Sequence, residues 1–172
     1  SNFFAEVTLA AMTLQGRSVI HSMWRDITER KHAEDELRLS EARLKKAERM
    51  ARIGNWELDL VHDKLVWSDE VFRIFEIDPA DFPASYEAFL DRIHPDDRES
   101  VNRAYTASLA NRQPYAIDHR IVMRDGRIKH VREQCETVFA ADGKPLTSTG
   151  TVQDITLIKQ AEESLIHHRD HL

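Results

Sequence analysis

The sequence predicts an α+β fold: a five-stranded antiparallel sheet with helices on one face, flanked by coiled-coil-type helices. Three observations predict it. The motif Asp26-Ile27-Thr28 recurs as Asp154-Ile155-Thr156. Each copy is followed by a stretch that lacks Gly and Pro and is rich in strong helix formers. Between the copies, alternating apolar and polar residues are separated by turn signals such as Asp125-Gly126, a pattern typical of antiparallel strands.

The repeat is longer than this motif. Lys31, Ala33, Glu34 and Leu37 also recur 128 residues later, so that seven identities stand at fixed spacing. Such self-similarity indicates two units that end in the same way. It divides the chain into the C-terminal strands of a truncated upstream domain at 1–28, a linker signalling helix at 29–51, a complete domain at 52–156 and the start of an outgoing signalling helix at 157–172.

The elements of the complete domain follow from local patterns. Strands are expected where apolar and polar residues alternate, at 55–60, 65–67, 115–123, 128–140 and 145–153. Ser68, Ser85 and His94 each precede a short helical pattern with acidic residues near its start. Ser68 is expected to cap its helix. Asp125-Gly126 matches the residue pair of a type I′ hairpin turn.

The two helical stretches carry a narrow apolar seam. Small or apolar residues recur at spacings of four and three, which is the heptad pattern of a two-stranded coiled coil. The alternative is an amphipathic helix that packs on its own domain. The seam favours pairing with a second chain, and its principal positions are Ala33, Leu37, Leu44, Ala47, Ala161 and Leu165.

The N-terminal segment predicts a two-stranded ribbon around a Gln15-Gly16 turn. Counting outward from this turn places three residues of the first strand opposite three of the second: Val7 with Trp24, Leu9 with Ser22 and Ala11 with Ile20. An apolar ribbon face needs cover. We therefore expect a homodimer formed through the flanking helices and the N-terminal strands.

Several short segments, in order, carry a family resemblance. They are Ile53-Gly54-Asn55-Trp56-Glu57, Ile93-His94-Pro95-Asp96-Asp97-Arg98, His119-Arg120-Ile121-Val122 with Asp125-Gly126, Asp142-Gly143-Lys144-Pro145 and the Gly150–Thr156 ending. Together they resemble a PAS domain with its C-terminal PAC part across 52–156, and 3–28 resembles the last strands of another. The resemblance implies a sensory, relay or dimerising domain joined to a histidine kinase or diguanylate cyclase in the same chain.

The resemblance also implies sites. Asp26, Thr28, Asp154 and Thr156 take the place of the turn that couples the sheet to the outgoing helix, although a helix cap without a signalling role is the alternative. The concave sheet face and the middle helices can enclose a ligand, or they can form a packed core without one. The candidate lining residues are Trp56, Phe72, Phe75, Phe89, Tyr105, His119 and Arg132.

The cofactor is left open, and none is one possibility. The light-oxygen-voltage flavin reaction needs an Asn-Cys-Arg motif on a middle helix, whereas the single cysteine, Cys135, falls on a strand. Haem is disfavoured because His94 and His119 fit structural positions. His167 and His171 have helical ligand spacing but no nearby ligand cluster, so we expect them, with His168, to be surface residues rather than metal ligands.

Charge and motifs exclude other functions. The formal net charge of −6 disfavours nucleic acid as a partner. No catalytic motif of a hydrolase, nucleotide-binding loop or zinc protease is present, so no catalytic residue is assigned. No run is long and apolar enough for a membrane span. A non-catalytic module in the cytoplasm is expected.

Overall fold

A computed structural model describes residues 3–83 and 85–169 of the chain. The chain divides into two compact units, Ser1–Ala47 and Glu48–Leu172, and each is considered by itself. Among the described residues, no helix combines the length and the apolar character needed to cross a membrane.

The first unit contains a ribbon and most of a long helix. Strands β1 (Ala5–Leu14) and β2 (Arg17–Asp26) pair antiparallel, and helix α1 spans Thr28–Ala51. Gln15 and Gly16 both have positive φ angles, as a two-residue type I′ turn requires. The predicted register is confirmed, since Val7 pairs with Trp24, Leu9 with Ser22 and Ala11 with Ile20.

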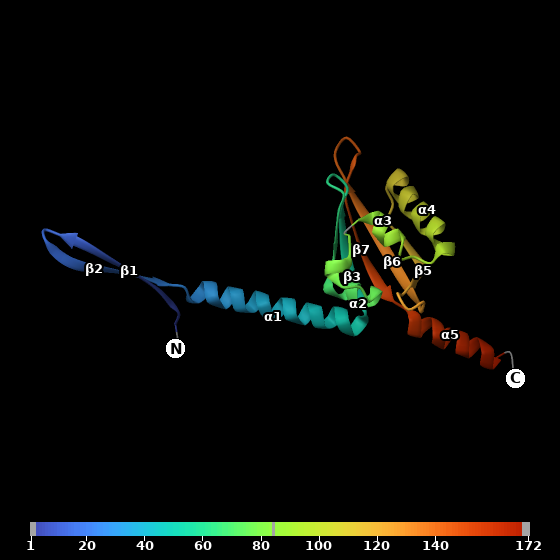
Figure 1. Cartoon of the computed structure of the whole chain (residues 1–172), viewed down its shortest axis with the longest axis horizontal. Coiled ribbons are helices and arrows are strands. Elements are labelled where there is room, and N and C mark those ends of the chain that lie inside the picture. The colour runs from blue at the N-terminus through green and yellow to red at the C-terminus, as the bar shows by residue number, and fades with distance from the viewer. Residues whose placement is uncertain (1–2, 84, 170–172) are drawn as a thin grey trace. The chain divides into compact units, whose positions relative to one another are not determined.

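The second unit is built on the predicted five-stranded antiparallel sheet (Figure 1). Its strands run in the spatial order β4-β3-β7-β6-β5. Their bounds are β3 Ile53–Asp59, β4 Lys64–Trp67, β5 Tyr115–Val122, β6 Ile128–Phe139 and β7 Pro145–Asp154. The α+β class and the strand positions are therefore confirmed, with boundary shifts of one or two residues.

Short helices cover the inner face of this sheet, and the outgoing helix follows β7 (Figure 1). The core between them is apolar, and Ile93, Val101, Ile121 and Val131 are fully buried there. The sheet face that lies against the helices is thus the face on which a binding site can form. The helices are α2 Asp69–Phe75, the 3-10 turn η1 Pro79–Asp81, α3 Tyr86–Leu90, α4 Pro95–Asn111 and α5 Thr156–Arg169.

Two local predictions were wrong. Ser68 stands at the N-cap of α2, but its hydroxyl makes no cap bond there and instead accepts the Asn55 N–H of β3 at 3.0 Å. Ser68 therefore ties the helix start to the sheet. At Asp125-Gly126 only Gly126 has a positive φ, and its N–H bonds to the Met123 carbonyl, so the turn is not type I′.

Candidate functional site

The strand-to-helix junction at Asp154-Ile155-Thr156 is closed by side-chain hydrogen bonds. The Thr156 hydroxyl donates to Asp154 Oδ1 at 2.6 Å, and the Thr156 N–H donates to the same oxygen at 3.0 Å. The Thr156 oxygen accepts the His130 N–H of β6 at 3.0 Å, and the Ile155 N–H donates to the His130 carbonyl at 2.9 Å. One residue of β6 therefore fixes where β7 ends and α5 begins.

The first junction repeats the main hydrogen bonds of this arrangement. The Phe4 N–H of the ribbon donates to Thr28 Oγ1 at 3.0 Å, and the Ile27 N–H donates to the Phe4 carbonyl at 2.9 Å. The Thr28 N–H donates to Asp26 Oδ1 at 2.9 Å. Hydrogen bonds from the Thr28 hydroxyl and N–H lower the pKa of Asp26. The predicted repeat is thus a structural repeat as well.

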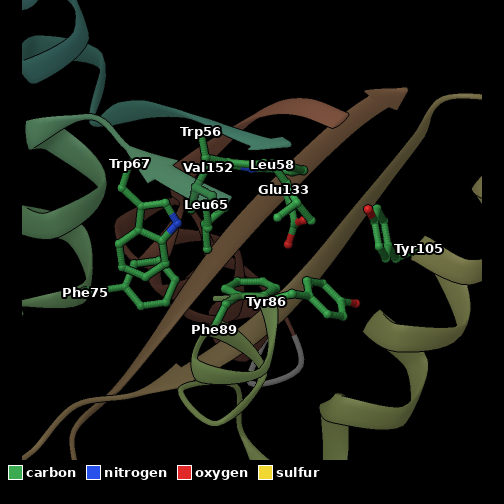
Figure 2. Close-up of a pocket in the computed structure, with 10 residues that line it drawn as sticks. All are labelled: Trp56, Leu58, Leu65, Trp67, Phe75, Tyr86, Phe89, Tyr105, Glu133 and Val152. Atoms are coloured by element: carbon green, nitrogen blue, oxygen red, sulfur yellow. The ribbon is translucent and has the colours of Figure 1, made fainter. Parts of the chain in front are cut away.

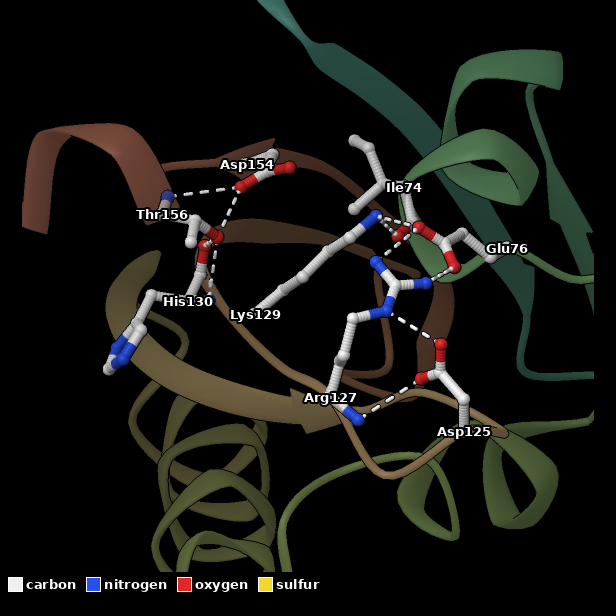
Figure 3. Close-up of polar contacts among 8 residues, drawn as sticks. All are labelled: Ile74, Glu76, Asp125, Arg127, Lys129, His130, Asp154 and Thr156. Carbon is white, nitrogen blue, oxygen red and sulfur yellow. Dashed lines mark hydrogen bonds and ion pairs between the residues drawn. The ribbon is translucent and has the colours of Figure 1, made fainter. Parts of the chain in front are cut away.

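Next to the second junction, β6 also holds the end of helix α2 (Figure 3). Lys129 Nζ donates to the Ile74 carbonyl at 2.8 Å and pairs with Glu76 at 3.0 Å. Arg127 bonds both Glu76 and Asp125. Because Lys129 precedes His130, adjacent residues of one strand contact the end of α2 and the start of α5.

On the outer face of the sheet, a second contact reaches α5. Arg132 donates to both carboxylate oxygens of Asp118, at 2.7 and 3.0 Å, which lowers the pKa of Asp118. Lys159 of α5 lies 3.4 Å from Asp118 Oδ2. Sequence reasoning missed Asp118 and Lys159 at this junction, although Lys159 belongs to the repeated pattern. The polar alternation of β5 places Asp118 on the outer face.

A small cavity lies between the sheet and the helices, with a volume of about 20 Å³ (Figure 2). Its walls come from both layers. Four of the predicted lining residues, Trp56, Phe75, Phe89 and Tyr105, border it. The other residues that border it are Leu58, Leu65, Trp67, Tyr86, Glu133 and Val152.

Three predicted lining residues lie elsewhere. Phe72 packs edge-on against Trp67 and Phe82, outside the cavity. His119 is buried beside it, edge-on to Phe89 at 6.2 Å between ring centres. The assignment of Arg132 is wrong, because successive residues of a strand point to opposite faces and Arg132 points to the outer one.

Among the lining residues that were not predicted, Glu133 is the charged one, and it is only 2% exposed. Tyr115 Oη donates to Glu133 Oε1 at 3.0 Å, and His119 Nε2 lies 3.1 Å from Glu133 Oε2. Burial, together with the nearby Glu133 carboxylate, raises the pKa of the Cys135 thiol to about 12 and that of Tyr115 above its usual range. Along β6, Glu133 falls on the same alternating positions as the buried apolar residues. This alternation was the signal in the sequence that its side chain lies on the inner face.

The predicted coiled-coil seam is exposed on the single chain. Leu37 and Leu44 of α1 are each 61% exposed and Leu165 of α5 is 72% exposed. Ala33, Ala47 and Ala161 are exposed as well. No group of three possible metal-ligating side chains is found in residues 3–83 and 85–169, and His171 lies outside this part of the chain.

The chain thus combines a helix-covered antiparallel sheet with an internal cavity and a polar junction to an outgoing helix. The family model described as "PAS fold" matches residues 64–152. The chain belongs to the PAS family.

Its relatives include a probable diguanylate cyclase and a sensor protein. The chain is 29% identical over 147 residues to a probable diguanylate cyclase, DgcE, of Escherichia coli, and 31% identical over 120 residues to the sensor protein FixL of Bradyrhizobium diazoefficiens. These alignments cover 86% and 70% of this chain but only 13% and 24% of the relatives.

Solved structures agree with this assignment. A sensory box histidine kinase/response regulator from Burkholderia thailandensis is 25% identical, with a TM-score of 0.62 over 75% of this chain and 96% of that one. The N-terminal domain of a diguanylate cyclase with PAS/PAC sensor from Marinobacter aquaeolei shares the fold, with 19% identity and a TM-score of 0.57 over 62% of this chain and 98% of that one.

Proposed function

We propose that this chain is a non-catalytic sensory and relay module of an intracellular signalling protein, passing conformational changes through its flanking helices to a downstream effector domain. The observation that carries the proposal is the duplicated Asp-Ile-Thr junction. Two helices, α1 and α5, leave their strands through the same hydrogen bonds. A kinase or a diguanylate cyclase is the effector type that the relatives suggest.

A relay needs a connection between the cavity and the outgoing helix. Phe75 of α2 lines the cavity, and Lys129 binds the carbonyl of the preceding residue, Ile74. His130 then binds Thr156 at the start of α5. A shift of α2 therefore acts on the same two-residue segment of β6 that anchors α5. Coupling of this kind is a population shift between two arrangements of the junction.

Replacing Thr156 with valine tests the relay against a simple helix cap. The variant removes the hydroxyl that joins Asp154 to His130, a loss of about 1 kcal/mol by analogy with helix caps. We expect amide hydrogen exchange to rise about fivefold in the first turn of α5, following from that free energy. We also expect faster exchange at Ile74–Glu76 of α2, measured by mass spectrometry of peptides.

The matched control is Thr28→Val at the first junction. It removes the same hydroxyl from α1 and should leave exchange in α2 and α5 unchanged. If Thr156→Val speeds exchange in α5 alone, Thr156 is only a cap and the relay proposal fails.

We further propose that residues 1–28 are the last strands of an upstream PAS unit and that the module works as a homodimer. The first proposal is supported by the shared hydrogen bonds of the two junctions. The second is supported by the exposed seam of Leu37, Leu44 and Leu165 and by the exposed ribbon residues Ile20 and Trp24.

Light scattering after gel filtration tests the dimer. At micromolar concentration we expect about twice the 20.0 kDa mass of one chain. The double variant Leu37→Asp/Leu44→Asp places charges in the seam and should weaken the dimer at least tenfold, since a desolvated charge costs several kcal/mol. Leu39→Asp is the control, because Leu39 is exposed on α1 but off the seam. A wild-type monomer, or equal effects of the seam and control variants, would contradict the pairing.

A ligand-occupied sensor is the second candidate, and the Glu133 cavity favours it. We propose a ligand smaller than haem or flavin. Sites for molecules of drug size have volumes of about 300 Å³ or more, whereas this cavity holds about 20 Å³. His119 and Cys135 lie outside its lining, so neither is placed for a haem ligand or a flavin adduct.

A further inference from the structure

A buried carboxylate faces the cavity. Glu133 lies on the inner face of β6, and its side chain points toward the rings of Tyr86 and Phe89 (Figure 2). Removing an ionised carboxylate from water costs several kcal/mol unless it is paired and hydrogen-bonded. Tyr115 and His119 supply hydrogen bonds that offset this cost.

Its two protein partners leave bonding capacity unused. The Tyr115 hydroxyl and the His119 ring contact one oxygen each, at 3.0 and 3.1 Å. A carboxylate offers about four acceptor positions. The part of Glu133 that borders the cavity can therefore accept further hydrogen bonds from a bound group.

The ribbon holds an apolar residue at the position that corresponds to Glu133. Glu133 pairs with Val152, two residues before Asp154. In the ribbon, Val7 pairs with Trp24, two residues before Asp26. Counted from the two junctions, Val7 thus corresponds to Glu133, so the carboxylate is not part of the repeat.

The remaining walls suit a cation. Aromatic rings attract positive charge at their faces, more strongly where water is excluded. The volume of about 20 Å³ admits a group about the size of a water molecule. An ammonium headgroup combines this size with positive charge and N–H donors. The rings that border the cavity are Trp56, Trp67, Phe75, Tyr86, Phe89 and Tyr105.

We infer that this cavity binds the ammonium headgroup of a small primary amine, with Glu133 as its anionic anchor. The inference rests on the proposed sensory role, for which it supplies a class of ligand. Tyr115 and His119 are positioning residues, because they hold the carboxylate in place without lining the cavity.

Titration with methylammonium chloride tests the inference. The purified chain is followed by tryptophan fluorescence, to which Trp56 and Trp67 of the lining contribute, and by its melting temperature, at constant chloride and ionic strength. We expect a saturable response in both signals, because a ligand that binds only the folded state stabilises it. Tetramethylammonium chloride, which is too large for the cavity, should give no saturable response.

Variants identify the anchor. Glu133→Gln keeps the side-chain shape and should weaken methylammonium binding at least tenfold, whereas Glu136→Gln, on the exposed face of the same strand, should not. If Glu133→Gln does not fold, Phe89→Leu removes a ring while leaving the carboxylate, and it should also weaken binding. The inference is overturned if the wild type gives no saturable response, or if Glu133→Gln binds methylammonium as well as the wild type. If Glu133→Gln is unfolded, unchanged binding by Phe89→Leu overturns it. The exchange test at Thr156 uses no ligand, so the two proposals fail separately.

Discussion

Replacing Gly150 with alanine is expected to lower the free energy of unfolding by about 3 kcal/mol, the upper part of the usual range for overpacking. A Cβ at this position of β7 would lie 2.1 Å from the Gln134 carbonyl oxygen and 2.6 Å from the Trp56 ring. The carbonyl belongs to the paired strand β6 and cannot move without opening the sheet. The methyl group therefore has to displace either the strand or the indole.

Urea denaturation followed by circular dichroism measures this effect. Thr149→Ala, one residue away on the same strand, adds no atom and should change stability by less than about 1 kcal/mol. A Gly150→Ala protein as stable as Thr149→Ala would mean that the strands tolerate the added methyl group, and the close packing of Trp56 on β7 would then carry little of the stability.

The second large effect is expected at Asp97 of α4. Its carboxylate accepts the Arg120 N–H at 2.8 Å and two guanidinium bonds, at 3.0 and 2.6 Å. These bonds from Arg120 lower the pKa of Asp97 from 3.8 to about 2. A pKa lowered by folding means that the ionised form stabilises the native state, by about 2 kcal/mol at neutral pH for a shift of this size.

Asp97→Asn should therefore reduce the free energy of unfolding by about 2 kcal/mol at pH 7. The folded-state pKa lies below the ordinary value, so the contribution is complete above about pH 5 and is lost as the pH falls toward 2. Denaturation at several pH values checks this. Asp96→Asn is the control, because Asp96 is largely exposed and 3.9 Å from Arg120. A stability difference that does not change with pH would contradict the assignment to charge.

The fold could be predicted because its signals are local. Alternation located the strands, and the Gln15-Gly16 turn set the ribbon register by counting alone. Ser68 shows the limit, since its helix position was correct but its hydroxyl bonds a residue of β3 that only the folded chain brings near. Local patterns do not specify such distant partners.

The cavity was only partly predictable, for a related reason. Aromatic residues such as Trp56 and Phe89 were placed correctly because large rings favour the interior. Glu133 was not, because charged side chains are buried only where partners exist. Those partners, Tyr115 and His119, come from another strand. Arg132 was assigned to the inner face, although the alternation of β6 places it on the outer one.

The shared junction bears on how such a chain can evolve. Deleting residues 28–155 would join Ile27 directly to Thr156 and restore an Asp-Ile-Thr sequence. In the joined chain, the Thr156 hydroxyl would take the place of the Thr28 hydroxyl, which accepts the Phe4 N–H. Recombination at this point can remove or duplicate a whole unit while the Asp-Ile-Thr sequence at the junction is kept. Gene rearrangement can therefore alter the number of units while each outgoing helix keeps the same connection to its strand.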